Sequence, residues 1–147
     1  MTDLPMHPEP PASPPGPGIV VLGRFQPFHH GHALLIKAAE EWRRLNASEL
    51  PLVIAIGSSN RPESIENPWS PTERIVMLNT WLETQGIGNV SIVTVPDIED
   101  PPNWVTHAER YHGTAGVFFT SDVSSAEHYE STAVSYTHLT LPTIYSV

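Results

Sequence analysis

The residues of this chain with the clearest capacity for chemistry lie together between positions 23 and 32, in the order Gly-Arg-Phe-Gln-Pro-Phe-His-His-Gly-His. Guanidinium and imidazole groups donate hydrogen bonds to phosphate oxygens, and glycine allows the backbone to approach a ligand closely. We therefore predict that this stretch binds a polyphosphate. The residues expected to contact it are Gly23, Arg24, Phe25, His29, Gly31 and His32.

Two other interpretations of the histidines are open. His29, His30 and His32 could hold a divalent metal ion, because imidazole is a common ligand of zinc and copper. Their spacing around a glycine differs from the i, i+4 spacing of zinc ligands on a helix, and the chain has no cysteine, so we predict no metal site built from side chains. The histidines could also merely cap the next helix, which would not explain the arginine and the glycines before them.

Further polar residues follow other apolar segments of the chain. Gly57 and Ser58 come after one apolar run, Asp97 comes after another, and Thr120 ends a third. Because the carboxyl ends of parallel strands meet at one edge of a sheet, where ligands bind, we expect these residues near the histidines. Local alternatives are a plain tight turn at Gly57 and Ser58, and a bond from Asp97 to its own backbone.

The elements that would position these residues alternate between strand and helix. Short apolar runs are typical of strands buried on both faces of a parallel sheet, and apolar residues at helical spacing indicate amphipathic helices. Ser70, Pro71 and Glu73 form a capping box with proline at the first helical position. This alternation predicts an α/β fold, a Rossmann-like three-layer structure with a mostly parallel sheet. The expected strands are 19–22, 52–56, 90–95 and 116–120, and the expected helices are 32–45, 71–84 and 104–112.

The two ends of the chain differ in character from its middle. Residues 1–18 contain seven prolines and almost nothing apolar, which predicts an extended, disordered leader. Residues 133–147 show no helical period. They resemble translated read-through of a sequencing adapter, so we expect them to be a non-native tail on a truncated gene; an edge strand is the alternative. The folded domain is then 19–132.

The charge balance limits the partners. The chain has 16 acidic residues against 7 basic ones, a formal net charge of −9, so long-range repulsion argues against nucleic acid and anionic membranes. No segment approaches the roughly 20 apolar residues that span a bilayer. We therefore expect a cytoplasmic protein with no nucleic-acid or membrane partner.

Residues 23–32 resemble, without a gap, the GRFQPxHxGH motif of archaeal-type nicotinamide-nucleotide adenylyltransferases in the HxGH nucleotidyltransferase superfamily. The resemblance implies a Rossmann-like fold and adenylyl transfer from ATP to nicotinamide mononucleotide (NMN), which forms NAD and pyrophosphate. It also implies that ATP and NMN are the partners and that Mg²⁺ assists with ATP. The similarity covers about 19–122 and continues, in the same order and spacing, at 56–58, 67–74, 96–98 and 104–105.

Roles for individual residues follow from the resemblance. His29, His32 and Arg24 are implied to be the catalytic residues that act on the ATP phosphates, while His30 falls on a variable position. Beyond the motif, the implied nucleotide contacts are Gly57, Ser58, Thr120 and Asp122. The implied NMN contacts are Asn67, Arg74, Asp97 and Trp104, with Trp104 stacking on the nicotinamide ring.

Some alternatives stay open at this level. Arg74 could simply pair with Glu73, and Trp104 could belong to the core. The later ISxTxIR-like motif of the family does not occur before Val147, so a nucleotide-binding fragment without turnover is one alternative function. Another HxGH transferase, acting on pantetheine phosphate, FMN or a cytidylyl acceptor, is a second, although Trp104 and residues 67–69 favour the NMN type. A following domain of the Nudix type and a homo-oligomer are both compatible with the family.

Overall fold

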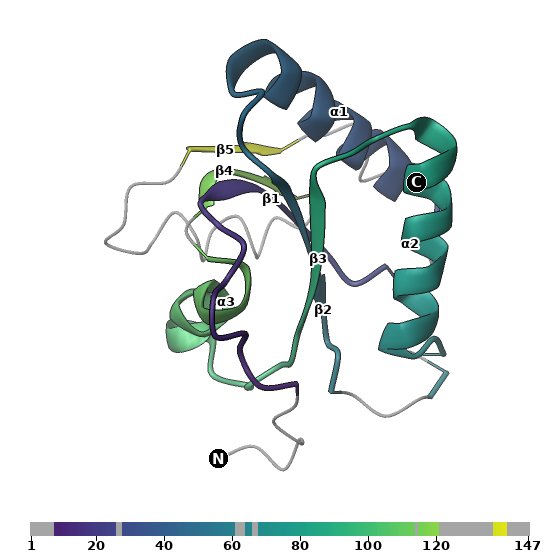
Figure 1. Ribbon diagram of the computed structural model, residues 1–147. Coiled ribbons are helices and arrows are strands. Elements are labelled where there is room, and N and C mark those ends of the chain that lie inside the picture. The colour runs from purple at the N-terminus through teal and green to yellow at the C-terminus, as the bar shows by residue number, and fades with distance from the viewer. Residues whose placement is uncertain are drawn as a thin grey trace.

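Helices on both sides of a parallel sheet define the architecture of the chain (Figure 1). The computed structural model describes residues 8–25, 28–60, 64–65, 68–113, 115–120 and 137–140. In this part of the chain the strands are β1 (Gly18–Gly23), β2 (Leu52–Gly57), β3 (Val90–Val95), β4 (Ala115–Thr120) and β5 (Thr137–Thr140). The helices are α1 (His30–Asn46), α2 (Pro71–Gln85) and α3 (Trp104–His112), with a short 3-10 turn, η1 (Pro101–Asn103), before α3.

The strands follow the order β3-β2-β1-β4-β5, and each neighbouring pair among the described residues is parallel. The chain moves outward from β1 to β2 and β3 through α1 and α2, and then returns through α3 to β4 on the other side of β1. The direction of winding therefore reverses at β1, which places a topological switch point at its carboxyl end. The predicted α/β fold with layered helices and a parallel sheet is confirmed.

The two faces of the sheet carry separate cores. Helices α1 and α2 cover one face and α3 covers the other (Figure 1). Ile19 and Val21 of β1 are buried in the first core with Leu35 of α1. Val20, between them in the sequence, is buried in the second core with Val105 of α3. Burial on both faces explains why β1 is a continuous apolar run instead of an alternating one.

Helix α2 begins and ends as the local sequence predicts. The hydroxyl of Ser70 accepts the backbone N–H of Glu73 at 3.1 Å, and the carboxylate of Glu73 accepts the backbone N–H of Ser70 at 2.9 Å. At its other end Gly86 adopts a left-handed conformation with φ of 68°, where glycine has no steric penalty. Helix α1 begins at His30, two residues before its predicted start, because His29 is its N-cap.

Residues 8–17 run beside α3 (Figure 1). The hydroxyl of Tyr111 donates to the carbonyl oxygen of Pro8 at 2.8 Å, and the N–H of Gly16 donates to the carbonyl oxygen of His112 at 3.0 Å. These contacts attach the proline-rich segment to the α3 side of the domain before β1 starts. Residues 1–7 lie outside the described residues, and disorder of the leader stays a prediction.

Thr137–Thr140 forms the edge strand β5, parallel to β4. This is the arrangement of the alternative interpretation of the C-terminal segment, an edge strand. Its non-native origin stays a prediction, and residues 133–136 and 141–147 lie outside the described residues.

Candidate active site

Several predicted site residues lie at the carboxyl ends of three neighbouring strands, β1, β2 and β3. The motif loop follows β1 and leads into α1, Gly57 ends β2, and Asp97 lies two residues beyond β3. Because β3, β2 and β1 are neighbours and parallel, all three ends lie along one edge of the sheet. Four residues of interest fall outside the described part of the chain: Gln26, Pro27, Asn67 and Asp122.

Two histidines of the motif cap the first turn of α1. Nδ1 of His29 accepts the backbone N–H of Gly31 at 3.1 Å, and Nδ1 of His32 accepts the backbone N–H of His29 at 3.2 Å. They form a capping box in which imidazoles stand in place of the usual serine and glutamate. The motif therefore satisfies backbone donors at the helix start with its own side chains.

The cap also determines which ring nitrogen carries the proton. A nitrogen that accepts a hydrogen bond carries no proton, so each neutral ring has its hydrogen on Nε2. The rings of His29 and His32 stack with their centroids 3.8 Å apart and their planes at 21°, and so they lie on the same side of the helix start. Two neighbouring Nε2–H donors thus lie beside the positive end of the α1 dipole.

This geometry bears on both alternative interpretations of the histidines. Among the residues that the structure describes, no group of three or more His, Cys, Asp or Glu side chains is placed to hold a metal ion. The capping role is real, but it uses only Nδ1 of each ring and leaves Nε2 for a ligand. Capping and ligand binding are therefore compatible in the same pair of imidazoles.

Aromatic side chains pack against the ring of His32. Its ring centroid lies 4.5 Å from that of Phe25 and 5.9 Å from that of Phe28, and Phe28 packs against Trp81 of α2 at 5.1 Å. Burial, with a smaller contribution from His29, lowers the pKa of His32 to about 4. At neutral pH the imidazole is uncharged and acts as a donor through Nε2.

Phe25 packs into the core, and its predicted contact with phosphate stays a prediction. Its side chain is fully buried in the core, so only its backbone can reach a ligand. A Cβ at Gly23 would lie 3.1 Å from the Phe25 ring, so the absence of a side chain at Gly23 permits this packing. Phe28, which the sequence analysis did not select, shares the support of His32; its aromatic type directly before His29 was the available signal.

Arg74 ties the ends of β1 and β2 together. The residue is 1% exposed, and its Nη1 donates to the carbonyl oxygens of Arg24 and Gly57, each at 2.8 Å. Its Nη2 donates to the carbonyl oxygen of Ser58 at 3.3 Å. Burial is the main cause that lowers its pKa, and the charge of Arg24 lowers it further. Arg74 uses these donors to hold backbone, and its predicted contact with NMN stays a prediction. The Arg24 side chain is exposed.

A second set of hydrogen bonds joins the ends of β2 and β3. The hydroxyl of Ser58 donates to Oδ2 of Asp97 at 2.9 Å. The side-chain amide of Asn60 donates to the carbonyl oxygen of Asp97 at 2.9 Å and accepts the N–H of Asp97 at 2.8 Å. Asn60 is 5% exposed and was missed by the sequence analysis. Its position just after Gly57 and Ser58 was the signal that could have drawn attention to it.

Two further predicted residues, Trp104 and Thr120, are at least partly buried in the fold. Trp104 begins α3 and is partly buried against the second core, so the core role is present, and stacking on a nicotinamide ring stays a prediction. Nε2 of His107, one turn further, donates to the carbonyl oxygen of Pro96 at 2.7 Å. Thr120 is buried and its hydroxyl donates to the carbonyl oxygen of Leu22 at 3.4 Å, inside the sheet. Its predicted nucleotide contact stays a prediction.

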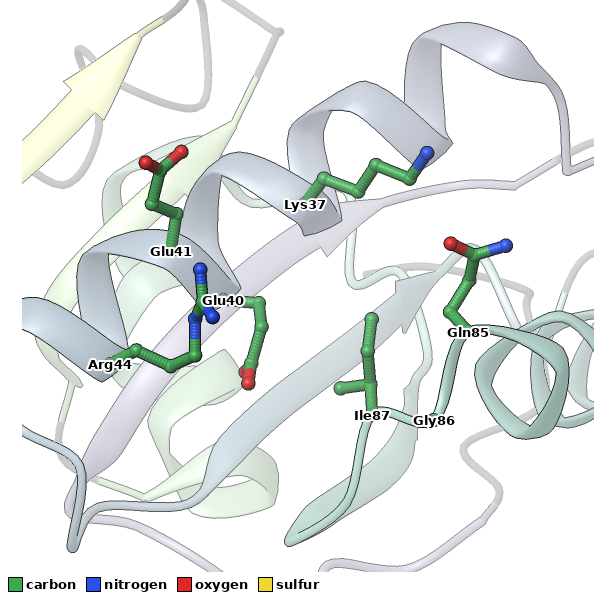
Figure 2. Close-up of a pocket in the computed structure, with 7 residues that line it drawn as sticks. All are labelled: Lys37, Glu40, Glu41, Arg44, Gln85, Gly86 and Ile87. Carbon is green, nitrogen blue, oxygen red and sulfur yellow. The ribbon is translucent and has the colours of Figure 1, made fainter.

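A separate hollow of about 370 Å³ lies between α1 and the end of α2 (Figure 2). Its lining has balanced charge, with Lys37 and Arg44 against Glu40 and Glu41. Gln85, Gly86 and Ile87 complete it from the C-terminal end of α2. None of the predicted site residues lines this hollow, so it is distinct from the strand-end site.

Comparison with known proteins gives matches over this same part of the chain. Residues 20–99 match the family model described as cytidylyltransferase-like. The nicotinamide-nucleotide adenylyltransferase of Picrophilus torridus is 35% identical over 89 residues, which are 60% of this chain and 49% of that protein. The protein of the same name from Ignicoccus hospitalis is 38% identical over 91 residues, 60% of this chain and 50% of that protein. The chain thus spans about half the length of the curated relatives it matches.

A solved structure shares the fold. The bifunctional NMN adenylyltransferase/ADP ribose pyrophosphatase of Francisella tularensis, crystallised with AMP and a manganese ion, aligns with a TM-score of 0.62 at 22% identity. The alignment covers 84% of this chain and 36% of that one. The match agrees with the layered parallel sheet of Figure 1.

Proposed function

The chain belongs to the cytidylyltransferase-like family, and from this premise we propose that it transfers the adenylyl group of ATP to NMN, forming NAD and pyrophosphate. The observation that carries the proposal is the stacked pair of His29 and His32 at the N-terminus of α1. The curated relatives that match this segment are named nicotinamide-nucleotide adenylyltransferases. Their names favour NMN over pantetheine phosphate, FMN or a cytidylyl acceptor.

The reaction requires positioning more than a general base. A 5′-phosphate oxygen of NMN is already ionised at neutral pH and attacks the α-phosphorus of ATP, while the bond from that phosphorus to the bridging oxygen of the β-phosphate breaks. Pyrophosphate leaves with that oxygen, and no covalent intermediate with the protein forms. The task of the protein is to hold two anions in line and to stabilise the negative charge on the transferring and leaving phosphates.

The residues after β1 suit this task. His29 and His32 offer Nε2–H donors that the cap holds in place, and the N-terminus of α1 adds its free N–H groups and positive potential. Arg24 adds a full positive charge from the exposed side of the same loop. An approaching triphosphate favours the charged form of an imidazole, so ATP binding raises the pKa of His32 and strengthens its hydrogen bond. These three residues are the proposed catalytic group.

ATP enters with a divalent cation, which we propose to be Mg²⁺. The structural relative from Francisella tularensis was crystallised with a manganese ion alongside AMP. We propose that the cation enters the site together with the ATP phosphates, as part of the substrate.

The proposed partners are ATP and NMN. In the described part of the chain no helix is both long enough and apolar enough to cross a bilayer. The expectations of a cytoplasmic location, of no nucleic-acid partner and of a homo-oligomer stay predictions.

The direct test is an adenylyl-transfer assay. The 147-residue chain is incubated with ATP, Mg²⁺ and one acceptor at a time, namely NMN, pantetheine phosphate or FMN, and pyrophosphate and dinucleotide are measured. NAD and pyrophosphate formed with NMN alone support the proposal. Product with a different acceptor overturns the choice of NMN. If the chain binds ATP but forms no product with any of the acceptors, a nucleotide-binding domain without catalytic activity is favoured.

A variant of His32 separates capping from catalysis. In His32→Asn the amide oxygen can replace Nδ1 as acceptor of the His29 N–H, whereas the Nε2–H donor is lost. We expect kcat to fall by about 100-fold or more, as for loss of other preorganised transition-state donors, with the helix start retained. His30→Asn, at the variable position, is the matched control. Normal turnover by His32→Asn contradicts the assignment.

A further inference from the structure

We propose that Asn60 is a positioning residue that sets the affinity of the site for its mononucleotide acceptor by fixing Asp97. The inference rests on the proposed function and on the contact between Asp97 and NMN that the sequence resemblance implies. Asn60 follows β2 and Asp97 follows the neighbouring strand β3, so the two residues are 37 positions apart in sequence and meet only because those strands pair. Neither the motif after β1 nor the ATP phosphates are involved in this contact.

The contact is a two-bond ring between one side chain and one backbone segment. The Asn60 amide donates to the carbonyl oxygen of Asp97 at 2.9 Å and accepts the N–H of Asp97 at 2.8 Å. Holding both backbone groups of one residue restricts its φ and ψ, and so directs the Cα–Cβ bond of Asp97. The Ser58 hydroxyl, at 2.9 Å from Oδ2, then restricts the carboxylate itself. Asp97 is fixed at its backbone by Asn60 and at its side chain by Ser58.

The chemistry of the ring requires an amide. Asparagine is short and offers a donor and an acceptor side by side on two separate atoms. Serine has a single oxygen for both functions, an ionised aspartate has no donor, and alanine has neither group. The ring is also nearly closed to water, because Asn60 is 5% exposed. Without the Asn60 side chain, the backbone N–H and carbonyl groups of Asp97 would lose these two hydrogen bonds where little water can replace them. The backbone around Asp97 would then shift to form other hydrogen bonds.

Neighbouring hydrogen bonds limit the effect of replacing Asn60 to the part of the site that would bind NMN. The N–H of Ser59 donates to the carbonyl oxygen of Val95 at 3.2 Å, and Arg74 holds the carbonyl oxygens of Gly57 and Ser58. These bonds keep β2 and the start of its loop in place when Asn60 is replaced. The expected change is therefore a movement of the Asp97 segment, while the imidazole pair at the start of α1 is unaffected.

The test compares nucleotide affinities of the 147-residue chain with those of Asn60→Ala and Ser58→Ala. The control is Asn46→Ala, which also removes one side-chain amide bond, from Asn46 Nδ2 to the carbonyl oxygen of Trp42 at the end of α1. Calorimetric titration with NMN and, separately, with ATP and Mg²⁺ gives the two Kd values. We expect Asn60→Ala to weaken NMN binding by about tenfold, as for the loss of one to two net hydrogen bonds, with the Kd for ATP within twofold of wild type.

Two further measurements separate positioning from general damage. Amide hydrogen exchange at Asp97 should become faster in Asn60→Ala, because its N–H loses its acceptor, and should not change in Asn46→Ala. Ser58→Ala removes only a hydroxyl and should weaken NMN binding as well, so the inference remains testable if Asn60→Ala does not fold. Because Ser58 is also an implied ATP contact, the comparison of ATP with NMN affinity applies to Asn60→Ala only. If the protein is active, steady-state kinetics of Asn60→Ala should show a higher KM for NMN, with little change in kcat or in the KM for ATP.

The outcomes distinguish the inference from the proposed function. A wild-type chain that binds neither nucleotide overturns the proposed function, and the inference falls with it. A wild-type chain that binds both nucleotides, with variants that bind NMN as tightly as wild type, overturns the inference alone. Equal weakening of ATP and NMN also overturns it, because that pattern indicates general loss of structure.

Discussion

Replacing His112 by asparagine should make the folded protein less sensitive to acid. His112 ends α3 and is fully buried, and its Nδ1 donates to the carbonyl oxygen of Gly113 at 2.6 Å. Burial lowers the pKa of this imidazole to about 4, although the bond to Gly113 opposes the change. Asparagine can keep a donor near the position of Nδ1 and cannot be protonated in this pH range.

The sign and the size follow from proton linkage. The folded pKa lies below the unfolded value of 6.5, so the unfolded chain binds more protons between pH 6.5 and pH 4. Stability is therefore fully present above pH 6.5 and is lost as the pH falls toward 4. Protonation costs the folded state about 3 kcal/mol more than the unfolded state, and the free energy of unfolding falls by about 2 kcal/mol between pH 7 and pH 5 from this one group.

The assay is urea unfolding of wild type and His112→Asn at pH 7, 6, 5 and 4.5. His32, whose pKa is also lowered to about 4, and the carboxylates contribute equally to both proteins, so the difference between the two curves isolates His112. We expect the variant to lose about 2 kcal/mol less than wild type between pH 7 and pH 5. His30→Asn, which removes an exposed imidazole, should follow the wild-type curve. Parallel curves for wild type and His112→Asn would refute the reasoning.

Three further substitutions test the local geometry. Gly113 has φ of 81° and ψ of −169°, and a Cβ there would lie 2.6 Å from the backbone nitrogen of Gly16, so Gly113→Ala should reduce the unfolding free energy by about 2 kcal/mol or more. Gly86→Ala, with positive φ but nothing within 4 Å of the added Cβ, should cost only about 1 kcal/mol; equal losses would show that the Gly16 contact is absent. Ser70→Ala should cost about 1 kcal/mol through loss of the α2 N-cap, and an unchanged unfolding midpoint in urea would contradict that cap.

The order of strands and helices was predictable because the signals for it are local. An apolar run such as 19–22 reports that both faces of a strand are covered, and a capping box such as Ser70 with Glu73 satisfies donors within four residues. The position of the phosphate-binding motif between a strand and a helix is equally local. These features need no knowledge of where distant segments lie.

Local sequence patterns were enough to predict the alternation of strands and helices, the three-layer α/β fold and the loop after β1 as the candidate site. The hydrogen bonds from Arg74 to backbone, from Thr120 inside the sheet and from Asn60 to Asp97 could be seen only in the folded chain. Each of these depends on which strands become neighbours, because the hydrogen-bond partners lie 16 to 98 positions apart in sequence. The local sequence around a polar residue is the same whether its side chain contacts a ligand or a buried carbonyl group. Which of the two it contacts depends on the tertiary fold.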